Sequence, residues 1–230
     1  MKSPAADAVL AGLPARLALV LVTPGDRAPA ATLALAREAL AGGVTALLLR
    51  EPQLERAARD GLARDLRAAT REHASLLLVS RDALLASACA ADGVHAGWGS
   101  PDVAALRAAL PGRIVGRSCH WPLEPDDLRA DWVLLSPFAP TTRSHPRPLL
   151  GAEQARAVLA RPGLPPAVAL GGLRAQDVPA LPEGLVGVAV VRAIADAADP
   201  RAAAHTLRAA VDARLAGGTR FGPPVAAGRV

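Results

Sequence analysis

The sequence predicts an α/β protein of the (β/α)₈ TIM-barrel class, folded as a single domain. Short apolar runs alternate with helical segments along most of the chain, eight such runs are present, and a length of 230 residues suits one barrel. Near-continuous apolar strands separated by helices are typical of a parallel sheet that is covered on both faces. An open, doubly wound sheet is the alternative architecture.

The predicted strands are rich in leucine, valine and isoleucine, and the segments between them repeat alanine, leucine and arginine with helical spacing. The eight strand candidates are residues 17–23, 44–50, 75–80, 93–97, 113–120, 131–136, 166–172 and 184–191. Helices are expected, for instance, at residues 30–43, 53–73 and 151–160. The first of these helices closes on the Gly42-Gly43 pair, which is a common helix-end signal.

The two ends of the chain fall outside the predicted barrel. We expect an N-terminal extension at residues 1–16, the barrel domain at 17–215 and a flexible C-terminal tail at 216–230. Residues 1–20 lack the charged head and continuous apolar run of a signal peptide, and no segment approaches the roughly 18 apolar residues of a membrane span. These features favour a cytoplasmic protein with no membrane partner.

Charge and composition narrow the classes of function. The net charge of +5 comes almost wholly from arginine, because Lys2 is the only lysine in the sequence. Schiff-base chemistry on an internal lysine is therefore excluded, and proton transfer falls to His, Asp, Glu or Cys. Dispersed arginines and few aromatic residues favour an anionic small molecule over nucleic acid. Cys89 and Cys119 are too few for a disulfide framework or a cysteine-based zinc site.

Reactive residues of a (β/α)₈ barrel lie at the carboxyl ends of the strands and in the loops that follow them. The loop after the sixth predicted strand is long, polar and rich in proline, so we expect it on the active-site face. Gly171 and Gly172 end the seventh strand, at a position where barrels commonly hold a phosphate against backbone N–H groups. A glycine pair also fits a plain turn.

The fifth predicted strand ends in the sequence Arg-Ser-Cys-His, which places a cysteine next to a histidine. Side chains alternate along a strand, so Ser118 and His120 face one side and Cys119 faces the other. Cys119 and His120 therefore cannot act together as nucleophile and base. His120 is a candidate acid/base residue, with a hydrogen-bonded histidine at the barrel rim as the structural alternative. The same alternation predicts that His95 is a buried core histidine.

Six motifs, in order, resemble the thiamine phosphate synthase/TenI family over about residues 17–200. They are LLLRE after the second strand, ADGVHAG at the fourth, GRSCH at the fifth, LSPFAPT after the sixth, ALGGL at the seventh and GVAVVRAI at the eighth. Each motif alone is ordinary, but their order and spacing make the signal specific. The resemblance implies a barrel that binds a thiazole phosphate in thiamine biosynthesis.

The resemblance also implies roles for individual residues. In the TenI branch the histidine of the fifth strand is the acid/base residue, and His120 matches it. The expected substrate-binding residues are Arg50, Ser118, Thr141, Ser144, Gly171, Gly172, Val191 and Arg192. An imidazole, with an unperturbed pKa of about 6.5, can remove one proton and return another during a tautomerisation.

The residues that the synthase branch uses for Mg²⁺ and diphosphate are largely replaced. That branch carries Gln-x-Arg-x-Lys after the second strand, Asn-Asp after the third and Gly-Gln-x-Asp after the fourth. Here the corresponding positions hold Leu48, Arg50 and Pro52, then Ser80 and Arg81, then Gly97, Trp98, Gly99 and Ser100. Asp82, one place later than the expected aspartate, and Glu51 are the remaining acids near the strand ends, which is thin support for Mg²⁺.

Three functions remain open at this point. The first is a TenI-like thiazole tautomerase that needs no cofactor and moves a proton with His120. The second is a divergent thiamine phosphate synthase, a transferase that would bind Mg²⁺ through Asp82. The third is a non-catalytic homologue that binds a phosphate ligand. For each of them we expect a phosphorylated thiazole as the partner, and the chain could also form a homo-oligomer.

Overall fold

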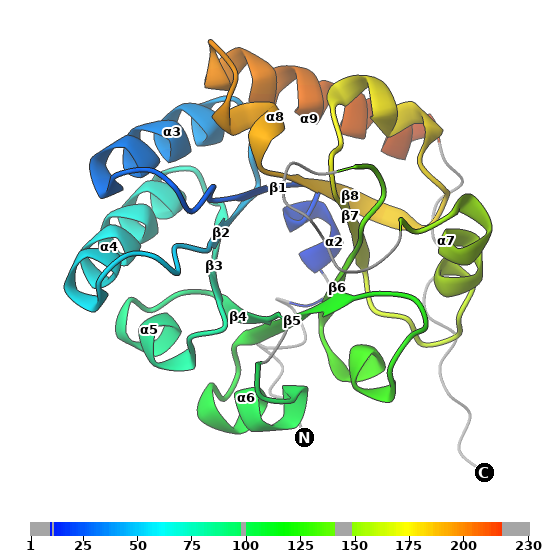
Figure 1. Cartoon of the computed structure of the whole chain (residues 1–230), viewed down its shortest axis with the longest axis horizontal. Helices are drawn as coiled ribbons and strands as arrows, with labels where there is room; N and C mark the ends of the chain where they lie inside the picture. Colours follow the sequence, from blue (N-terminus) through cyan, green and yellow to red (C-terminus); the bar gives the residue numbers. More distant parts are fainter. Residues whose placement is uncertain (1–9, 11, 98–99, 141–148, 218–230) are drawn as a thin grey trace.

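The structure, a computed structural model, describes residue 10 and residues 12–97, 100–140 and 149–217. Its eight strands pair in parallel and in chain order, from β1 round to β8 and back to β1, as a closed barrel (Figure 1). The strands are β1 (Leu19–Val22), β2 (Ala46–Leu49), β3 (Leu76–Ser80), β4 (Gly93–Ala96), β5 (Ile114–Cys119), β6 (Trp132–Leu135), β7 (Ala167–Leu170) and β8 (Leu185–Val190). The predicted (β/α)₈ barrel is confirmed, and closure of the sheet excludes the open alternative.

Seven α-helices in the described part of the chain surround the barrel on its outer side (Figure 1): α3 (Pro29–Ala41), α4 (Arg56–Glu72), α5 (Ala83–Ala88), α6 (Val103–Ala109), α7 (Ala152–Leu159), α8 (Arg192–Ala195) and α9 (Pro200–Gly217). The remaining described α-helix, α2 (Leu13–Arg16), does not belong to this outer layer. Two connections contain short 3₁₀ helices, η1 (Pro125–Arg129) and η2 (Ala175–Ala180). Pro179 lies inside η2, where a proline disrupts regular α-helical hydrogen bonding, whereas Pro125 is the first residue of η1.

Strand alternation divides the core into two layers. Side chains that point outward pack against the helices, as Leu21, Leu47 and Val115 do. Side chains that point inward fill the barrel, and Trp132 is the bulkiest of the fully buried ones. Because this inner filling is solid, a ligand has to bind at the end of the barrel.

Both predicted chain-end segments are partly described. Residues 13–16 form α2, which lies within the ring of strands in Figure 1, and its Leu13 is buried in the inner layer. At the other end, α9 runs to Gly217. Residues 1–9 and 218–230 lie outside the described part of the chain. Among the described residues, no helix has the length and apolarity that crossing a membrane requires.

Candidate active site

The barrel brings most of the predicted site residues to one end. Because all eight strands run in parallel, the residues that follow them lie together at the carboxyl-terminal mouth. The described site residues are Arg50 after β2, Ser118 in β5, His120 after β5, Gly171 and Gly172 after β7, and Val191 and Arg192 after β8. Thr141 and Ser144 fall within residues 141–148, which are outside the described residues.

His120 is held in one orientation by the end of β6. Its Nδ1 lies 2.8 Å from the backbone oxygen of Ser136. A carbonyl oxygen only accepts hydrogen bonds, so Nδ1 carries the proton and donates it. In the neutral imidazole the lone pair is then on Nε2, which is the atom that can act as a base.

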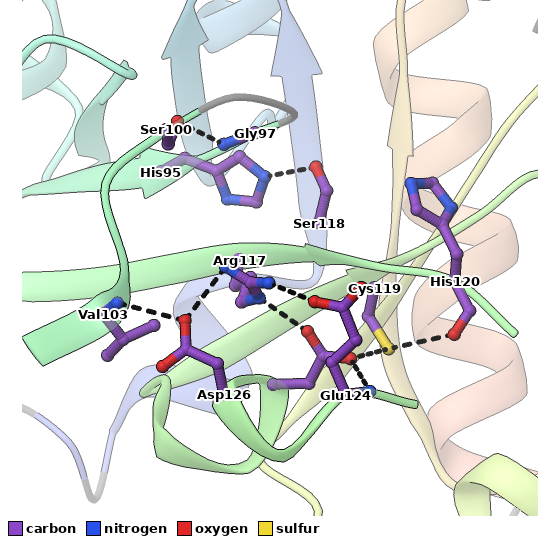
Figure 2. Close-up of polar contacts among 11 residues, drawn as sticks. His95, Gly97, Ser100, Val103, Arg117, Ser118, Cys119, His120, Glu124 and Asp126 are labelled. Carbon is purple, nitrogen blue, oxygen red and sulfur yellow. Dashed lines mark hydrogen bonds and ion pairs between the residues drawn. The ribbon is translucent and has the colours of Figure 1, made fainter. Parts of the chain in front are cut away.

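The two faces of β5 differ as the alternation predicts. In Figure 2, Ser118 and the imidazole of His120 lie on one side of the strand, and the Cys119 sulfur lies on the other. Cys119 is fully buried, and its Sγ is 3.5 Å from Oδ2 of Asp127. Burial, with a contribution from Asp127, raises the pKa of the Cys119 thiol. Cys119 is therefore a packing thiol and does not activate His120.

A cluster of ion pairs around Arg117, on the outer face of β5, anchors the segment after His120. The sequence motifs did not indicate this cluster. Arg117 forms ion pairs with Glu124 (2.6 Å), Asp126 (3.0 Å) and Asp127 (2.7 Å), all in or next to η1 (Figure 2). Asp126 also accepts a hydrogen bond from the backbone N–H of Val103, which begins α6. The cluster ties the end of β5 to two neighbouring elements.

The glycine pair after β7 is required by a close backbone approach. Both residues have positive φ, +118° at Gly171 and +62° at Gly172. A Cβ atom on Gly172 would lie 2.2 Å from the backbone oxygen of Pro140, in the loop that follows β6. Ala139 in that loop donates a backbone hydrogen bond of 3.0 Å to Gly171. The pair thus lets the β6 loop lie directly on the β7 loop.

The loop after β8 is joined to the loop after β1 by ion pairs. Val191 precedes α8, and the Arg192 side chain contacts Asp26 and, at 3.2 Å, Asp196. Arg27, next to Asp26, also pairs with Asp196 at 3.3 Å. The Arg192 guanidinium is thus engaged with carboxylates, so its backbone N–H is the better candidate for an anion contact at this loop.

The carboxylates that follow β2 and β3, Glu51 and Asp82, form hydrogen bonds that stabilise the fold. Glu51 is 2% exposed and accepts from the Gly25 N–H (3.2 Å) and from Gln53 (2.7 Å). Asp82 caps α5 by accepting from the Leu85 N–H at 2.9 Å. It also lies 3.4 Å from Arg59.

The synthase branch implies a Mg²⁺ ion, and the contacts of Glu51 and Asp82 bear on whether these carboxylates could bind it. Within the described part of the chain, no three His, Cys, Asp or Glu residues are grouped as metal ligands. Mg²⁺ is usually held by one or two carboxylates together with waters and substrate phosphates, and Asp82 already serves a helix end and an arginine. Asp82 therefore has a structural role in this arrangement, and the described side chains form no preformed cage for Mg²⁺.

His95 lies inside the barrel, as predicted, but it contacts the site. The residue is 3% exposed, and its Nε2 lies 3.0 Å from Oγ of Ser118 (Figure 2). Burial, together with the charge of Arg117, lowers the pKa of His95 to about 3. This imidazole is therefore neutral at any ordinary pH. The contact with Ser118 depends on the pairing of β4 with β5, which sequence periodicity does not give.

Comparisons with known proteins agree with the motifs. The family model described as thiamine monophosphate synthase matches residues 19–194. A thiamine-phosphate synthase of Geobacillus thermodenitrificans is 35% identical over 183 residues, which cover 76% of this chain and 83% of the relative. The thiamine-phosphate synthase of Xanthomonas campestris pv. campestris is 37% identical over 199 residues, covering 82% and 93%.

A solved structure agrees with the sequence relatives. The thiamine phosphate pyrophosphorylase of Pyrococcus furiosus superimposes with a TM-score of 0.76 at 27% identity and covers 88% of this chain and 99% of its own. These proteins carry the synthase name, and the comparisons do not distinguish the TenI branch. With the family model matching most of the barrel, the chain belongs to the thiamine phosphate synthase/TenI family.

Proposed function

We propose that this protein is an enzyme of thiamine biosynthesis that acts on a thiazole phosphate bound at the carboxyl-terminal mouth of the barrel. The observation that carries the proposal is that two family motifs lie at that mouth, Ser118-x-His120 at the end of β5 and Gly171-Gly172 after β7. The loops after β7 and β8 would hold the phosphate through backbone N–H groups. The thiazole ring would then lie beside His120.

Coupling of the thiazole phosphate to a pyrimidine diphosphate is the first candidate reaction. The relatives support it, because they are named thiamine-phosphate synthase at 35% and 37% identity. Their names favour this transferase over the tautomerase that the motifs placed first. The departing diphosphate has to be stabilised, and within the described residues no three His, Cys, Asp or Glu side chains are grouped to hold Mg²⁺. Arg50 and Arg81, at the ends of β2 and β3, would have to supply the positive charge.

Aromatisation of a carboxythiazole phosphate by proton transfer is the second candidate reaction. The fixed ring of His120 supports it, because a neutral imidazole with Nδ1–H bound to Ser136 offers Nε2 as the base. The protonated ring can return a proton to another atom of the substrate. This tautomerisation requires no metal, which agrees with the structural roles of Glu51 and Asp82.

One set of assays separates these reactions. The purified protein would be given the carboxythiazole phosphate tautomer, and separately thiazole phosphate with the pyrimidine diphosphate, each with Mg²⁺ and with EDTA. Mg²⁺-dependent release of pyrophosphate would establish coupling. Aromatised product in EDTA, lost in His120→Ala, would establish the tautomerase.

Binding alone decides the remaining cases. Calorimetric titration with thiazole phosphate should show binding whichever reaction holds. Binding without turnover in either assay would identify the non-catalytic homologue. Failure of thiazole phosphate to bind, with or without the pyrimidine diphosphate, would refute the proposal as a whole.

A further inference from the structure

Three neighbouring strands place two buried rings over a glycine in the barrel interior. The register pairs His95 of β4 with Gly116 of β5, and Gly116 with Trp132 of β6. A Cβ atom on Gly116 would lie 2.3 Å from Nε1 of Trp132 and 2.7 Å from Nδ1 of His95. The two ring centroids are 4.9 Å apart. The absence of a side chain at Gly116 thus lets both ring nitrogens face the same small space.

Neither of these nitrogens has a hydrogen-bond partner within the described residues. Trp132 is 0% exposed and His95 is 3% exposed, so bulk water does not reach them. The indole Nε1 can only donate a hydrogen bond. A proton on His95 Nδ1 would turn two donors toward the same space, whereas a lone pair there leaves an acceptor facing the indole N–H.

The proton of the neutral His95 ring then belongs on Nε2, which lies 3.0 Å from Oγ of Ser118. In this tautomer His95 is the donor and Ser118 Oγ is the acceptor. A hydroxyl group has a single proton, so the proton of Ser118 remains for another acceptor. Ser118 is half-buried and lies on the same side of β5 as the His120 ring (Figure 2).

We propose that His95 is a positioning residue, held as the Nε2–H tautomer, which donates to Ser118 and so directs the Ser118 hydroxyl proton toward an acceptor atom of the ligand beside His120. For its ligand the inference rests on the proposed function. The acceptor would be an unprotonated ring nitrogen or an anionic oxygen of the thiazole phosphate. Ser118 orients the substrate, and His120 moves the proton.

The tautomer can be measured without a ligand. Long-range ¹H–¹⁵N correlation spectra of the full chain labelled with ¹⁵N-histidine report which ring nitrogen carries the proton. We expect Nε2–H and an unprotonated Nδ1 for His95 from pH 5 to 8, with the signals assigned by their loss in His95→Gln. An Nδ1–H tautomer would overturn the inference.

Ligand binding tests the effect on Ser118. A glutamine amide at position 95 can still donate, whereas leucine cannot. In calorimetric titrations with thiazole phosphate, His95→Leu and Ser118→Ala should each weaken binding about tenfold, the size of one hydrogen bond. The double variant should bind no more weakly than either one, and His95→Gln should stay within about threefold of the wild type.

Independent losses in His95→Leu and Ser118→Ala that add in the double variant would contradict the inference. So would wild-type affinity in a folded His95→Leu protein, with near-ultraviolet circular dichroism as the check on folding. If His95→Leu does not fold, the tautomer and the behaviour of His95→Gln still decide. If the wild type binds no thiazole phosphate, the proposed function fails, and the spectra test the tautomer separately.

Discussion

The two halves of the barrel mouth use their polar side chains differently. In the half formed by β5 to β8, Ser118 forms a hydrogen bond with His95, and the Nδ1 proton of His120 is fixed by the backbone oxygen of Ser136. In the half formed by β1 to β4, Glu51 and Asp82 serve the β1 loop and the start of α5. The acids of the β1–β4 half thus stabilise the fold, whereas the β5–β8 half carries the Ser-x-His motif and the glycine pair.

If the proposed function holds, this difference assigns separate parts of the reaction to the two halves of one barrel. The strands that carry the mouth residues are held by apolar layers on both sides, so a changed residue at a strand end leaves the core intact. Under the proposed function, phosphate binding and proton transfer depend on β5, β7 and β8. Diphosphate and metal binding would depend on β2, β3 and β4, where the family pattern is replaced.

The largest expected effect is the loss of proton transfer in the β5–β8 half. His120→Ala should lower turnover of the carboxythiazole phosphate tautomer by about 10²- to 10⁴-fold, because it removes the general base. Asp82→Ala, on the other half, is the matched control and should change turnover by less than about threefold. Initial rates at saturating substrate measure both. Equal losses in the two variants would remove the functional distinction between the halves.

The glycine pair of the β5–β8 half gives the next effect. Gly172→Ala should lower the free energy of unfolding by about 3 kcal/mol, because its Cβ would meet Pro140 and φ is positive. Gly163→Ala is the control for backbone strain alone: φ there is +78°, but no atom lies within 4 Å of the added Cβ. It should cost about 1 kcal/mol. Urea unfolding measures both values.

Gly172→Ala should also weaken binding of thiazole phosphate, because the β6 and β7 loops would move apart at the proposed phosphate site. Calorimetry on the two alanine variants checks this. Wild-type affinity in Gly172→Ala would show that the phosphate binds elsewhere. A similar loss in Gly163→Ala would show that the loss of affinity follows general destabilisation.

The strands could be predicted because each depends on local pattern. Apolar runs marked all eight, and most of the ends were placed one or two residues too far out, because flanking residues such as Arg113 and His120 adjoin the strand without joining the ladder. The opposite facing of Cys119 and His120 also followed from alternation alone. The short 3₁₀ helices were not predicted, although the prolines at 125 and 179 were a visible signal.

The contacts that shape the site depend on pairing between distant segments. His95 and Ser118 are 23 residues apart, and Arg117 meets Asp127 across a turn, so periodicity within one strand indicates neither pair. The capping role of Asp82 could have been predicted from the sequence, since an aspartate just before an apolar helix is a typical N-cap. The register between strands and the approach of one loop to another can be read only from the three-dimensional fold. The strand register also sets the space next to Gly116.

Acid should destabilise the barrel through His95, which joins the two halves by its bond to Ser118. Its pKa of about 3 in the folded state lies below the 6.5 of a free imidazole. As pH falls through 6.5, the unfolded chain takes up the proton first, so stability that is complete above pH 6.5 is lost progressively down to pH 3.

This single group should lower the free energy of unfolding by about 2 kcal/mol between pH 7 and pH 5. The comparison is the difference between wild type and His95→Gln in urea unfolding at the two pH values, because other titrating groups are common to both proteins. His95→Gln should lack this part of the loss. The same pH dependence in both would mean that His95 is not buried as a neutral ring.

The smallest effect tests the structural role of the acids in the β1–β4 half. Asp82→Ala should cost about 1 kcal/mol of stability through loss of the α5 cap. Asp102→Ala is a matched control, because Asp102 caps α6 by accepting from the Ala105 N–H at 2.7 Å. We expect similar costs, and no change in the response of the melting temperature to Mg²⁺ in either variant. If Asp82→Ala alone abolished a stabilisation by Mg²⁺ or a Mg²⁺-dependent release of pyrophosphate, Asp82 would be a metal ligand. The β1–β4 half would then belong to the active site.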